Sequence, residues 1–548
     1  MPSRPSRTSD TADILIIGAG ASGGAAAWYL AKHGFKVICL EQGPWVKPAE
    51  FVTDDPDFEV LIRDAWNFNP NVRRLPQDYP VNDAASAIKP LMFNAVGGST
   101  IHWTAHAPRL HPSDFRVKSL DGVADDWPIA YGDLEPFYDL NDEMMGCAGI
   151  SGDPANPPRS PRPMPPLSIG RDGEKLARGF ERLGWHWWPS DNYVNSVPYR
   201  GRAACNHCGV NGYGCRLGAK GSADLTYWPE AVKLGAEVRP WSRVYEVATG
   251  RDGRVTGARY FDRSGEKQFQ RARAVIIACN GVGTPRLLLL SKSSRHPRGL
   301  ANSSGLAGKN LMFHPYSAAS GFFGEDLESY KGAGANIIMS QEFYETDRSR
   351  GFVRGYTFQI GRSSTPVATA MGQLRQAGFA SPVRNSAWGP HHHAEFERRF
   401  GRALGMAAIG EDLPEPHNRV ELDGHLTDSH GIPAPRVNYT LSENSKRLVA
   451  HGAMMAAKAL KASGAHSVSV TPLIVQGGWH LMGTARMGEG PRDSVVDRHG
   501  QAHDADNLFV IDGSVFVTSA GVNPTPTIQA IALWAADYIA KKRTDLKG

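Results

Sequence analysis

The hydrophobic pattern near the start of the chain predicts a strand, a helix and a second strand in close succession. Residues 14–17 form a short run of apolar, mostly branched side chains, which is typical of a buried parallel strand. The alanine-rich stretch 25–31 indicates a helix, which Gly34 ends. A second apolar run at 36–40 predicts the next strand, and this strand ends at Glu41.

Similar patterns occur in two later parts of the chain. Residues 274–279 predict a strand that runs into a glycine-rich turn at 280–285 and then into a leucine-rich helix at 287–290. Residues 507–511 predict another strand, and Pro526 suits the start of a C-terminal helix with an apolar face. Strands and helices that follow one another in this way indicate an α/β fold.

Composition and charge narrow the functional classes. The chain has 548 residues, enough for more than one domain, and a net charge of +5 with basic and acidic residues interleaved. This balance gives no electrostatic footprint for nucleic acid or for an anionic membrane surface. No apolar run approaches the roughly 18–20 residues that a membrane span needs.

The N-terminal segment 1–11 contains no apolar stretch, and its two arginines, Arg4 and Arg7, are not adjacent. We therefore expect neither a secretory signal nor a twin-arginine signal. The cytoplasm is the expected location, and export to the periplasm with a signal-bearing partner subunit is the alternative.

A glycine-rich turn joins the first strand to the first helix, and the glycines of its G-x-G-x-x-G pattern are Gly18, Gly20 and Gly23. Glycines at these positions let the backbone approach a pyrophosphate at the helix N-terminus, where unpaired N–H groups favour negative charge. Glu41 is placed to accept hydrogen bonds from the ribose of a dinucleotide. The turn fits NAD and FAD equally well, so the choice of cofactor depends on the rest of the chain.

Several segments together resemble the glucose–methanol–choline (GMC) oxidoreductases, and the resemblance covers nearly the whole chain. Besides the first turn, they are GGSTIHWT at 97–104, GTP at 283–285, HLMGTARMG at 480–488 and VNPTPT at 522–527. The second turn and the VNPT sequence are most similar to two branches of that family. These are the sugar and sugar-acid dehydrogenases of the gluconate and fructose type, and the pyranose oxidases.

The resemblance implies a discontinuous fold, in which a Rossmann-like FAD-binding domain is assembled from several stretches around an inserted substrate domain. The expected FAD-binding stretches are 10–110, 218–312 and 470–548. The segment 313–469 is expected to supply an antiparallel sheet and helices over the flavin. Residues 111–217 are expected to be loops that cover the cofactor or form an assembly surface.

The resemblance also implies FAD as the cofactor and gives cofactor-binding positions in the matching segments. They are Gly18, Gly20, Ala21, Ser22, Gly23, Glu41, Gly97, Gly98, Ser99, His102, Trp103, Thr104, Val238, Gly281, Asp512, Gly513, Asn523, Pro524 and Thr525. In pyranose oxidases a histidine like His102 is bonded covalently to the flavin, whereas in related dehydrogenases a histidine there does not guarantee this. We expect His102 to pack against the flavin without a bond.

Oxidation of a carbinol removes a proton from oxygen and a hydride from carbon, and flavin N5 accepts the hydride. The resemblance implies that His480 is the base, and an imidazole pKa of about 6.5 suits that task. Asn523 matches the partner position and can hydrogen-bond the same oxygen. The alternatives are a histidine that only packs beside Trp479 and an asparagine favoured ahead of Pro524 at a helix start.

Three cysteines, Cys205, Cys208 and Cys215, lie close together with His207 between them. Their C-x2-C-x6-C spacing has no evident fourth ligand and departs from the spacing of the iron–sulfur cluster in related heteromeric dehydrogenases. We expect structural thiols, with an iron–sulfur cluster or a zinc site as the alternatives. The histidine run 391–393 is expected to be a loop and not a metal site.

These features together predict FAD-dependent oxidation of a hydroxyl group of a sugar, glycoside or sugar acid. One alternative is a flavin-containing lyase of the same fold, which performs no net redox chemistry. Another is the catalytic subunit of a heteromeric periplasmic sugar dehydrogenase that passes electrons to a cytochrome. Oxygen or a quinone is the expected electron acceptor, and both a homo-oligomer and a complex with a small subunit remain open.

Overall fold

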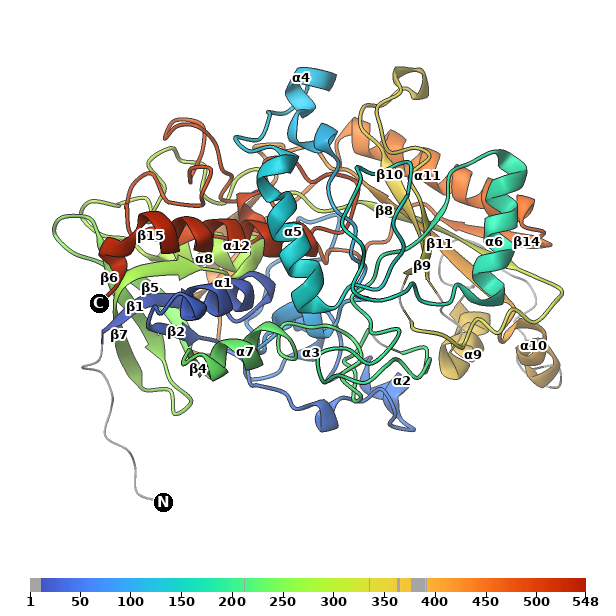
Figure 1. Ribbon diagram of the computed structural model, residues 1–548, viewed down its shortest axis with the longest axis horizontal. Helices are drawn as coiled ribbons and strands as arrows, with labels where there is room; N and C mark the ends of the chain where they lie inside the picture. The colour runs from blue at the N-terminus through green and yellow to red at the C-terminus, as the bar shows by residue number, and fades with distance from the viewer. Residues whose placement is uncertain (1–10, 211, 335, 362–364, 376–389, 391) are drawn as a thin grey trace.

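The computed structural model describes residues 11–548 except 211, 335, 362–364, 376–389 and 391 (Figure 1). The segment 1–10, on which the expectation about export signals rests, and His391 therefore lie outside the described residues. Two sheets dominate the described part of the chain. In Figure 1 the first sheet and its helices lie on the left, near the C-terminus, and the second sheet lies on the right.

The first sheet has seven strands, and its main path runs β4-β2-β1-β7-β6-β5. These strands are β1 (Ala12–Ile17), β2 (Val37–Leu40), β4 (Glu237–Arg239), β5 (Arg243–Thr249), β6 (Val255–Phe261), β7 (Lys267–Ile277) and β15 (Leu508–Val510). The C-terminal half of β7 pairs in parallel with β1 and β15, whereas its N-terminal half pairs antiparallel with β6. A parallel Rossmann-like core thus carries an antiparallel extension.

Strand β1 is buried on both faces, which explains why its sequence is apolar at every position after Asp13. Ile14 and Ile16 pack in one core cluster with the side chains of α1 (Ala21–Lys32), and Leu15 and Ile17 pack in another. Successive side chains of a strand point to opposite faces, so β1 must present apolar side chains to a cluster on each face. The β1 strand is thereby fixed at the centre of the sheet.

Helices cover this first sheet. They are α1, α5 (Tyr131–Met145), α7 (Tyr227–Lys233), α8 (Asn280–Leu290) and α12 (Thr525–Lys542). Helix α1 packs against both α12 and α7, and α12 also packs against α5. The glycines and alanines of α1 allow this close approach, because they present almost no side chain at the contact.

The second sheet has six strands in the order β14-β8-β11-β10-β9-β3. They are β3 (Trp188–Pro189), β8 (Tyr316–Phe322), β9 (Asn336–Ser340), β10 (Tyr356–Gly361), β11 (Ala403–Gly410) and β14 (Ser467–Thr471). All of its pairings are antiparallel. Helix α11 (Glu443–Ala462) packs on β8 and β11, and α6 (Gly170–Leu183) packs on α11.

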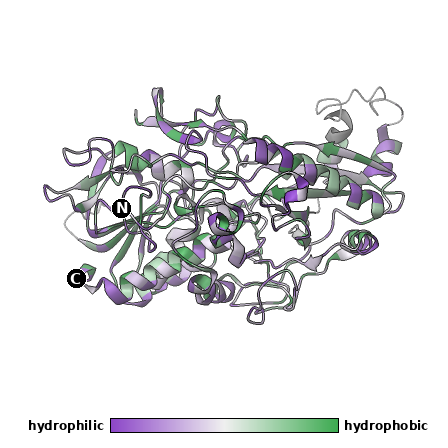
Figure 2. Ribbon diagram, turned by 90° about the horizontal axis from the view of Figure 1, so that it is seen from above, coloured by the Kyte–Doolittle hydropathy of each residue, from purple (hydrophilic) through white to green (hydrophobic). Residues whose placement is uncertain are grey.

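The remaining elements are short. The strands β12 (Arg419–Thr427) and β13 (Pro433–Asn438) form a separate hairpin, and the other helices are α2 (Phe58–Leu61), α3 (Pro70–Arg73), α4 (Val117–Asp121), α9 (Pro366–Arg375) and α10 (His392–Arg399). In Figure 2 hydrophobic colours gather on the strands and hydrophilic colours on the outer helices and loops. No helix among the described residues is both long enough and apolar enough to cross a bilayer.

The expected fold class, an α/β Rossmann-like domain with an inserted antiparallel sheet, is confirmed, but three local expectations are wrong. The turn expected at 280–285 is the first part of α8, because the Asn280 Oδ1 caps its free end by accepting from the N–H groups of Val282 and Gly283. The segment 111–217 is not made of loops alone, because α5 and α6 lie in it and pack on α12 and α11.

The histidine run was also expected to be a loop, yet α10 begins at His392. Glu395 lies in the first turn of this helix and forms ion pairs with Arg398 and Arg399, three and four positions later. Pairs at these spacings stabilise a helix, and a carboxylate near its N-terminus is favoured by the helix dipole. These charges explain why the segment is helical.

Candidate active site

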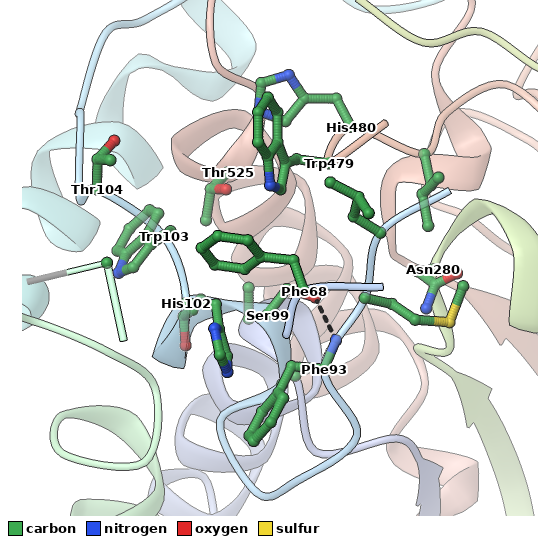
Figure 3. A pocket seen from close by; sticks show the side chains of 18 of the residues that line it. Phe68, Phe93, Ser99, His102, Trp103, Thr104, Asn280, Trp479, His480 and Thr525 are labelled. Carbon is green, nitrogen blue, oxygen red and sulfur yellow. Dashed lines mark hydrogen bonds between the residues drawn. The ribbon is translucent and has the colours of Figure 1, made fainter. Parts of the chain in front are cut away.

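A cavity of about 770 Å³ lies between the two sheets and is lined by residues of both. Its lining extends from Gly18 and Glu41 at the first sheet to Ala318 and Ala407 at the second, with His480 and Asn523 also in its wall. Figure 3 shows part of this lining, with Phe68 between His102 and Trp479. The cavity therefore joins the expected nucleotide turn to the expected catalytic pair.

The three glycines of the first turn have different tasks. A Cβ on Gly18 would lie 2.4 Å from the carbonyl oxygen of Ala278, and a Cβ on Gly23 would lie 2.1 Å from the carbonyl oxygen of Gly18. Both positions therefore need glycine for close packing, and Gly18 also has a φ of +100°. A Cβ on Gly20 would meet nothing within 4 Å, so this residue faces open space in the cavity at the start of α1.

Glu41 connects two turns through its carboxylate. Its Oε2 accepts a hydrogen bond from the N–H of Ala19 at 2.8 Å, and its Oε1 accepts one from the N–H of Gly43 at 2.8 Å. Burial raises the pKa of Glu41 to about 7, while the backbone N–H groups oppose this rise. A carboxylate has further lone pairs for a ribose, so Glu41 can hold both the turn and a ligand.

The second glycine turn lies directly on the first. A Cβ on Gly98 would be 2.9 Å from the Cα of Gly20, so the two turns touch through their backbones. Ser99 fixes the other side, since its Oγ accepts a hydrogen bond from the N–H of Phe93 at 3.2 Å, drawn as the dashed line in Figure 3. This contact brings residues 18–23 and 97–104 to one end of the cavity.

Most of the cofactor-binding positions expected from the sequence line this cavity. They are Gly18, Gly20, Ala21, Ser22, Glu41, Gly98, Ser99, His102, Trp103, Thr104, Asp512, Gly513, Asn523, Pro524 and Thr525. Four others, Gly23, Gly97, Val238 and Gly281, are not part of the lining.

Those four residues act in the surrounding structure. Gly97 has a φ of +99° and no room for a side chain beside Asp224. A Cβ on Gly281 would lie 2.5 Å from the carbonyl carbon of Leu481, so glycine lets α8 approach the segment that carries His480. Val238 pairs with Cys39 in the sheet.

His102 is enclosed by aromatic rings. Its ring centroid lies 4.2 Å from that of Phe93 and 4.9 Å from that of Phe68. Both ring nitrogens are buried without a hydrogen-bond partner among the described residues. Burial lowers the pKa of His102 well below its usual 6.5, and the positive charges of Arg73 and Lys220 lower it further. The His102 ring is therefore neutral, and although the residue lines the cavity, its two ring nitrogens are fully buried and not exposed to it.

His480 also lines the cavity, and its main partner is a second histidine. The Nδ1 of His480 lies 2.7 Å from the Nδ1 of His314, and the two rings pack edge to face. Burial lowers the pKa of His480 well below 6.5, and the neighbouring His314 and His106 add to this effect. The imidazole is therefore neutral at pH 7 and able to accept a proton. Trp479 instead packs its ring against Tyr316.

Asn523 is held by two polar side chains that the sequence did not indicate. Its Oδ1 lies 2.9 Å from the Nδ1 of His106 and accepts a hydrogen bond from the Nε2 of Gln359. These two contacts occupy the oxygen and leave the amide Nδ2 of Asn523 to donate to a ligand. Because Gln359 comes from β10 and Asn523 from the start of α12, no local spacing in the sequence signals their contact.

Small residues from the second sheet form one wall of the cavity. Neighbouring strands place Gln359 opposite Ala407 and Ala407 opposite Ala318. The next row in the same register places Gly361 opposite Gly405. All five residues line the cavity, and four of them are alanine or glycine. We refer to Ala318, Gly361, Gly405 and Ala407 as the small-residue wall.

A polar contact joins α2 and α9 beside the cavity. The carboxylate of Glu59 on α2 accepts hydrogen bonds from the Oγ1 of Thr365 and from the N–H groups of Val367 and Ala368. These groups lie at the N-terminus of α9, where N–H donors lack partners within the helix. Phe58, beside Glu59, contributes to the cavity lining.

The three clustered cysteines do not meet at a metal site in the described part of the chain. Cys208 is exposed, Cys205 and Cys215 are half-buried, and none forms a disulfide. No group of three or more His, Cys, Asp or Glu side chains among the described residues is arranged to hold a metal ion. That the protein binds no iron or zinc stays a prediction, which elemental analysis of the purified protein tests.

The sequence is similar to a known family of proteins over nearly its whole length. A family model described as GMC oxidoreductase matches residues 172–316 and another matches residues 414–532. A model of an NAD(P)-binding Rossmann-like domain matches residues 16–74. The chain is 42% identical to 2-methyl-1,2-propanediol dehydrogenase of Mycolicibacterium austroafricanum, over 98% of this chain and 97% of that protein. The chain belongs to the GMC oxidoreductase family.

A further relative agrees with this assignment, and a solved structure shares the fold. The fructose dehydrogenase large subunit of Gluconobacter japonicus is 32% identical over 96% of this chain and 98% of that subunit. An Aspergillus oryzae formate oxidase variant shares the fold, with a TM-score of 0.67 and 14% identity over 99% of this chain and 100% of that one. The chain is therefore an oxidoreductase that acts on alcohol groups.

FAD, the cofactor expected for this family, fits the cavity of the GMC oxidoreductase. Gly20 leaves space beside the N-terminus of α1, where a pyrophosphate finds free N–H groups. Glu41 lies at the end of β2, in reach of the same part of the cavity. His102 also lines the cavity, with its two ring nitrogens fully buried.

Proposed function

We propose that this GMC oxidoreductase oxidises a small, compact alcohol or diol, with His480 as the base and Asn523 as the group that holds the hydroxyl oxygen. The observation that carries the proposal is the position of this pair in the same cavity as the small-residue wall. Bound FAD would accept the hydride that leaves the carbinol carbon. The protein supplies the remaining functions: it orients the hydroxyl, takes its proton and excludes water.

The proton step follows from the surroundings of His480. Because burial and two neighbouring histidines keep its pKa low, the ring is neutral at pH 7 and ready to take the hydroxyl proton. The Nδ2 of Asn523 donates a hydrogen bond to the same oxygen, on which negative charge develops as the proton leaves. A hydrogen bond to a charged oxygen is stronger than one to a neutral hydroxyl, so this contact favours the reaction.

The size and polarity of the cavity support a compact substrate. Alanine and glycine at the small-residue wall leave room for a branched carbon skeleton, while Tyr316, Trp479 and Phe68 add apolar surface. Two polar groups near the wall already have partners: Gln359 bonds Asn523, and Thr365 bonds Glu59. Each sugar hydroxyl left without a partner would cost about 1–3 kcal/mol.

One of the two relatives supports the same choice, and the other supports the competing one. The relative with 42% identity is named for 2-methyl-1,2-propanediol, a branched diol, and the relative with 32% identity is named for fructose. A sugar, which the sequence motifs favour, is therefore the competing substrate for the same oxidation of a hydroxyl group.

Anaerobic flavin reduction distinguishes these substrates. The FAD-loaded protein is mixed in turn with 2-methyl-1,2-propanediol, 2-propanol, glucose, fructose and gluconate, and the loss of flavin absorbance is followed. We expect the branched diol to reduce the flavin faster, at equal concentration, than any of the three carbohydrates. Faster reduction by a sugar or by gluconate would overturn the small-alcohol proposal and support sugar oxidation. If no hydroxyl compound reduces the flavin, the redox assignment fails in favour of the lyase alternative.

The electron acceptor can be assigned in the same experiment. After reduction by the substrate, the protein is exposed separately to oxygen and to a soluble quinone, and the return of the flavin absorbance is timed. We propose a dehydrogenase, because both relatives described above, each more than 30% identical, are named as dehydrogenases. Reoxidation should then be faster with the quinone, and faster reoxidation by oxygen would make the protein an oxidase.

A further inference from the structure

His314 and His480 are brought together by a pair of backbone hydrogen bonds. The N–H of Met312 donates to the carbonyl of Met482 at 3.0 Å, and the N–H of Met482 donates to the carbonyl of Met312 at 3.1 Å. Each histidine lies two positions from one of these methionines. Although 166 positions separate the two histidines in the sequence, their rings are therefore held at a fixed distance.

The hydrogen on His314 is located by two backbone carbonyls. Its Nε2 lies 2.7 Å from the carbonyl oxygen of Ala520 and 3.1 Å from that of Ser519. A carbonyl oxygen can only accept, so Nε2 must carry the hydrogen. Complete burial lowers the pKa of His314 to about 4, which keeps the ring neutral at pH 7. A neutral imidazole carries one hydrogen, so the Nδ1 of His314 is an acceptor.

The position of the hydrogen on His480 follows from the position of the hydrogen on His314. The Nδ1 atoms of His480 and His314 are 2.7 Å apart, so one of them donates to the other. Since the Nδ1 of His314 is an acceptor, the Nδ1 of His480 carries the hydrogen. The neutral His480 ring then has an unprotonated Nε2, and this atom has no hydrogen bond to a described residue.

We propose that His314 is a positioning residue that fixes the tautomer of His480, so that Nε2 is the atom that accepts the substrate proton. The inference rests on the proposed role of His480 as the base. When Nε2 takes a proton, the Nδ1–H of the resulting imidazolium still donates to His314. A neutral acceptor at this position stabilises the cation, as an orienting partner does for other catalytic histidines.

The carbonyl groups that orient His314 belong to the segment that also carries Asn523. Ala520 has a φ of +57°, an uncommon value for alanine, and its carbonyl points to the Nε2 of His314. The Oγ of Ser519 ties this segment to the second sheet, because it donates to the carbonyl of Asp412, just after β11, at 2.9 Å. The backbone of residues 519–520 thus sets the tautomer of His480 through His314. The same segment leads directly to Asn523, which binds the hydroxyl oxygen.

Two substitutions of His314 test the proposal. His314→Asn places an amide oxygen where Nδ1 was, so it keeps an acceptor for His480. His314→Leu removes the acceptor and leaves an apolar side chain of similar size. His503→Leu is the matched control, because His503 bonds Ser494 at 2.8 Å and does not line the cavity.

The first readout is the tautomer of His480, measured by ¹⁵N NMR of histidine-labelled protein at pH 7.5, and it needs no substrate. We expect the Nδ1–H tautomer in the wild type and in His314→Asn, and a mixture of tautomers in His314→Leu. A wild-type protein with the hydrogen on Nε2 would overturn the proposal. So would an unchanged single tautomer in His314→Leu. The Asn variant keeps the test decisive if His314→Leu does not fold.

The second readout is the rate of flavin reduction by 2-methyl-1,2-propanediol across pH. Loss of an orienting partner typically costs about 10–100-fold, which is the fall we expect in His314→Leu, with a changed pH profile. The rate of His314→Asn should stay within a few-fold of wild type. Equal losses in His314→Asn and His314→Leu would mean a structural role only. If the NMR result holds but no alcohol reduces the flavin, the proposed function fails while the tautomer assignment stands.

Discussion

The side-chain oxygen of Asn523 lies 2.9 Å from the Nδ1 of His106, although 417 positions separate the two residues in the sequence. Gln359 donates to the same oxygen. The orientation of the Asn523 amide is therefore set by the protein before any substrate binds. A preorganised donor needs no rearrangement as charge develops on the substrate oxygen, which is the condition for effective electrostatic catalysis.

We predict that Asn523→Ala slows flavin reduction by about 10–100-fold, because it removes one hydrogen bond to a charged oxygen, worth about 1.5–3 kcal/mol. Stopped-flow reduction of the FAD-loaded variant measures this. Asn156→Ala, at a position that does not line the cavity, is the control and should reduce at the wild-type rate. A wild-type rate for Asn523→Ala as well would remove Asn523 from the reaction.

Glu41 leads to a prediction about cofactor affinity. Its carboxylate holds the N–H groups of Ala19 and Gly43 and faces the cavity, so Glu41→Arg places a charged, longer side chain at the ribose end. We expect FAD binding to weaken by about 1.5–3 kcal/mol, the value of hydrogen bonds to a charged group. Titration of the apoprotein with FAD measures the change. The exposed Glu50 gives a control of equal charge change, Glu50→Arg, which should bind FAD normally. Equal affinities in the two variants would show that Glu41 does not contact the cofactor.

The bond between His102 and the flavin can be tested by acid precipitation. Both ring nitrogens of His102 are fully buried, so neither is exposed to a flavin in the cavity. We therefore predict that acid releases FAD into the supernatant. Flavin that stays with the denatured wild-type chain, but is released from His102→Ala, would establish the covalent bond instead.

The small-residue wall predicts an effect on substrate size. Ala407→Phe should fill part of the cavity and raise the KM for 2-methyl-1,2-propanediol by about tenfold or more. One methylene in a hydrophobic pocket changes the binding free energy by about 1–3 kcal/mol. FAD binding should be unchanged, because Ala407 lies on the second sheet. Val470→Phe, at an exposed position of β14 in the same sheet, is the control. If both variants keep the wild-type KM, the substrate does not bind at this wall.

The nucleotide end of the site could be predicted from the sequence because its determinants are local. Gly18, Gly20 and Gly23 lie in one turn between a strand and a helix, and Glu41 ends the next strand. Backbone geometry at such a turn depends on neighbours in the chain, so the pattern is visible in a single sequence. His480 and Asn523 could also be predicted, because each lies in a short segment that resembles the family.

The residues around the catalytic pair could not be predicted. His314 contacts His480 across 166 positions, and Gln359 contacts Asn523 across 164. Such contacts arise only when segments far apart in the sequence fold against each other, and no periodicity or spacing records them. The helix at His392 differs from the expected loop for another reason: the ion pairs of Glu395 with Arg398 and Arg399 outweigh the turn signal of the neighbouring proline and histidines.

The central claim is that His480 takes the hydroxyl proton. Because its pKa is held below 6.5, the ring is neutral above that pH and becomes protonated, and unable to act, as the pH falls through the lowered value. In the wild type the rate of flavin reduction should therefore rise with pH through an apparent pKa below 6.5 and level off above that pKa. His480→Ala should bind FAD, lose this dependence and reduce about 10²–10⁴-fold more slowly.

Stopped-flow reduction of His480→Ala by 2-methyl-1,2-propanediol, with His503→Ala as the matched control, is the most direct measurement. We expect a folded, FAD-loaded His480→Ala protein whose flavin is reduced at least a hundredfold more slowly than in the control, in line with the loss of a general base at about 10²–10⁴-fold. Reduction at the rate of the control, in protein that has kept its FAD, would contradict it.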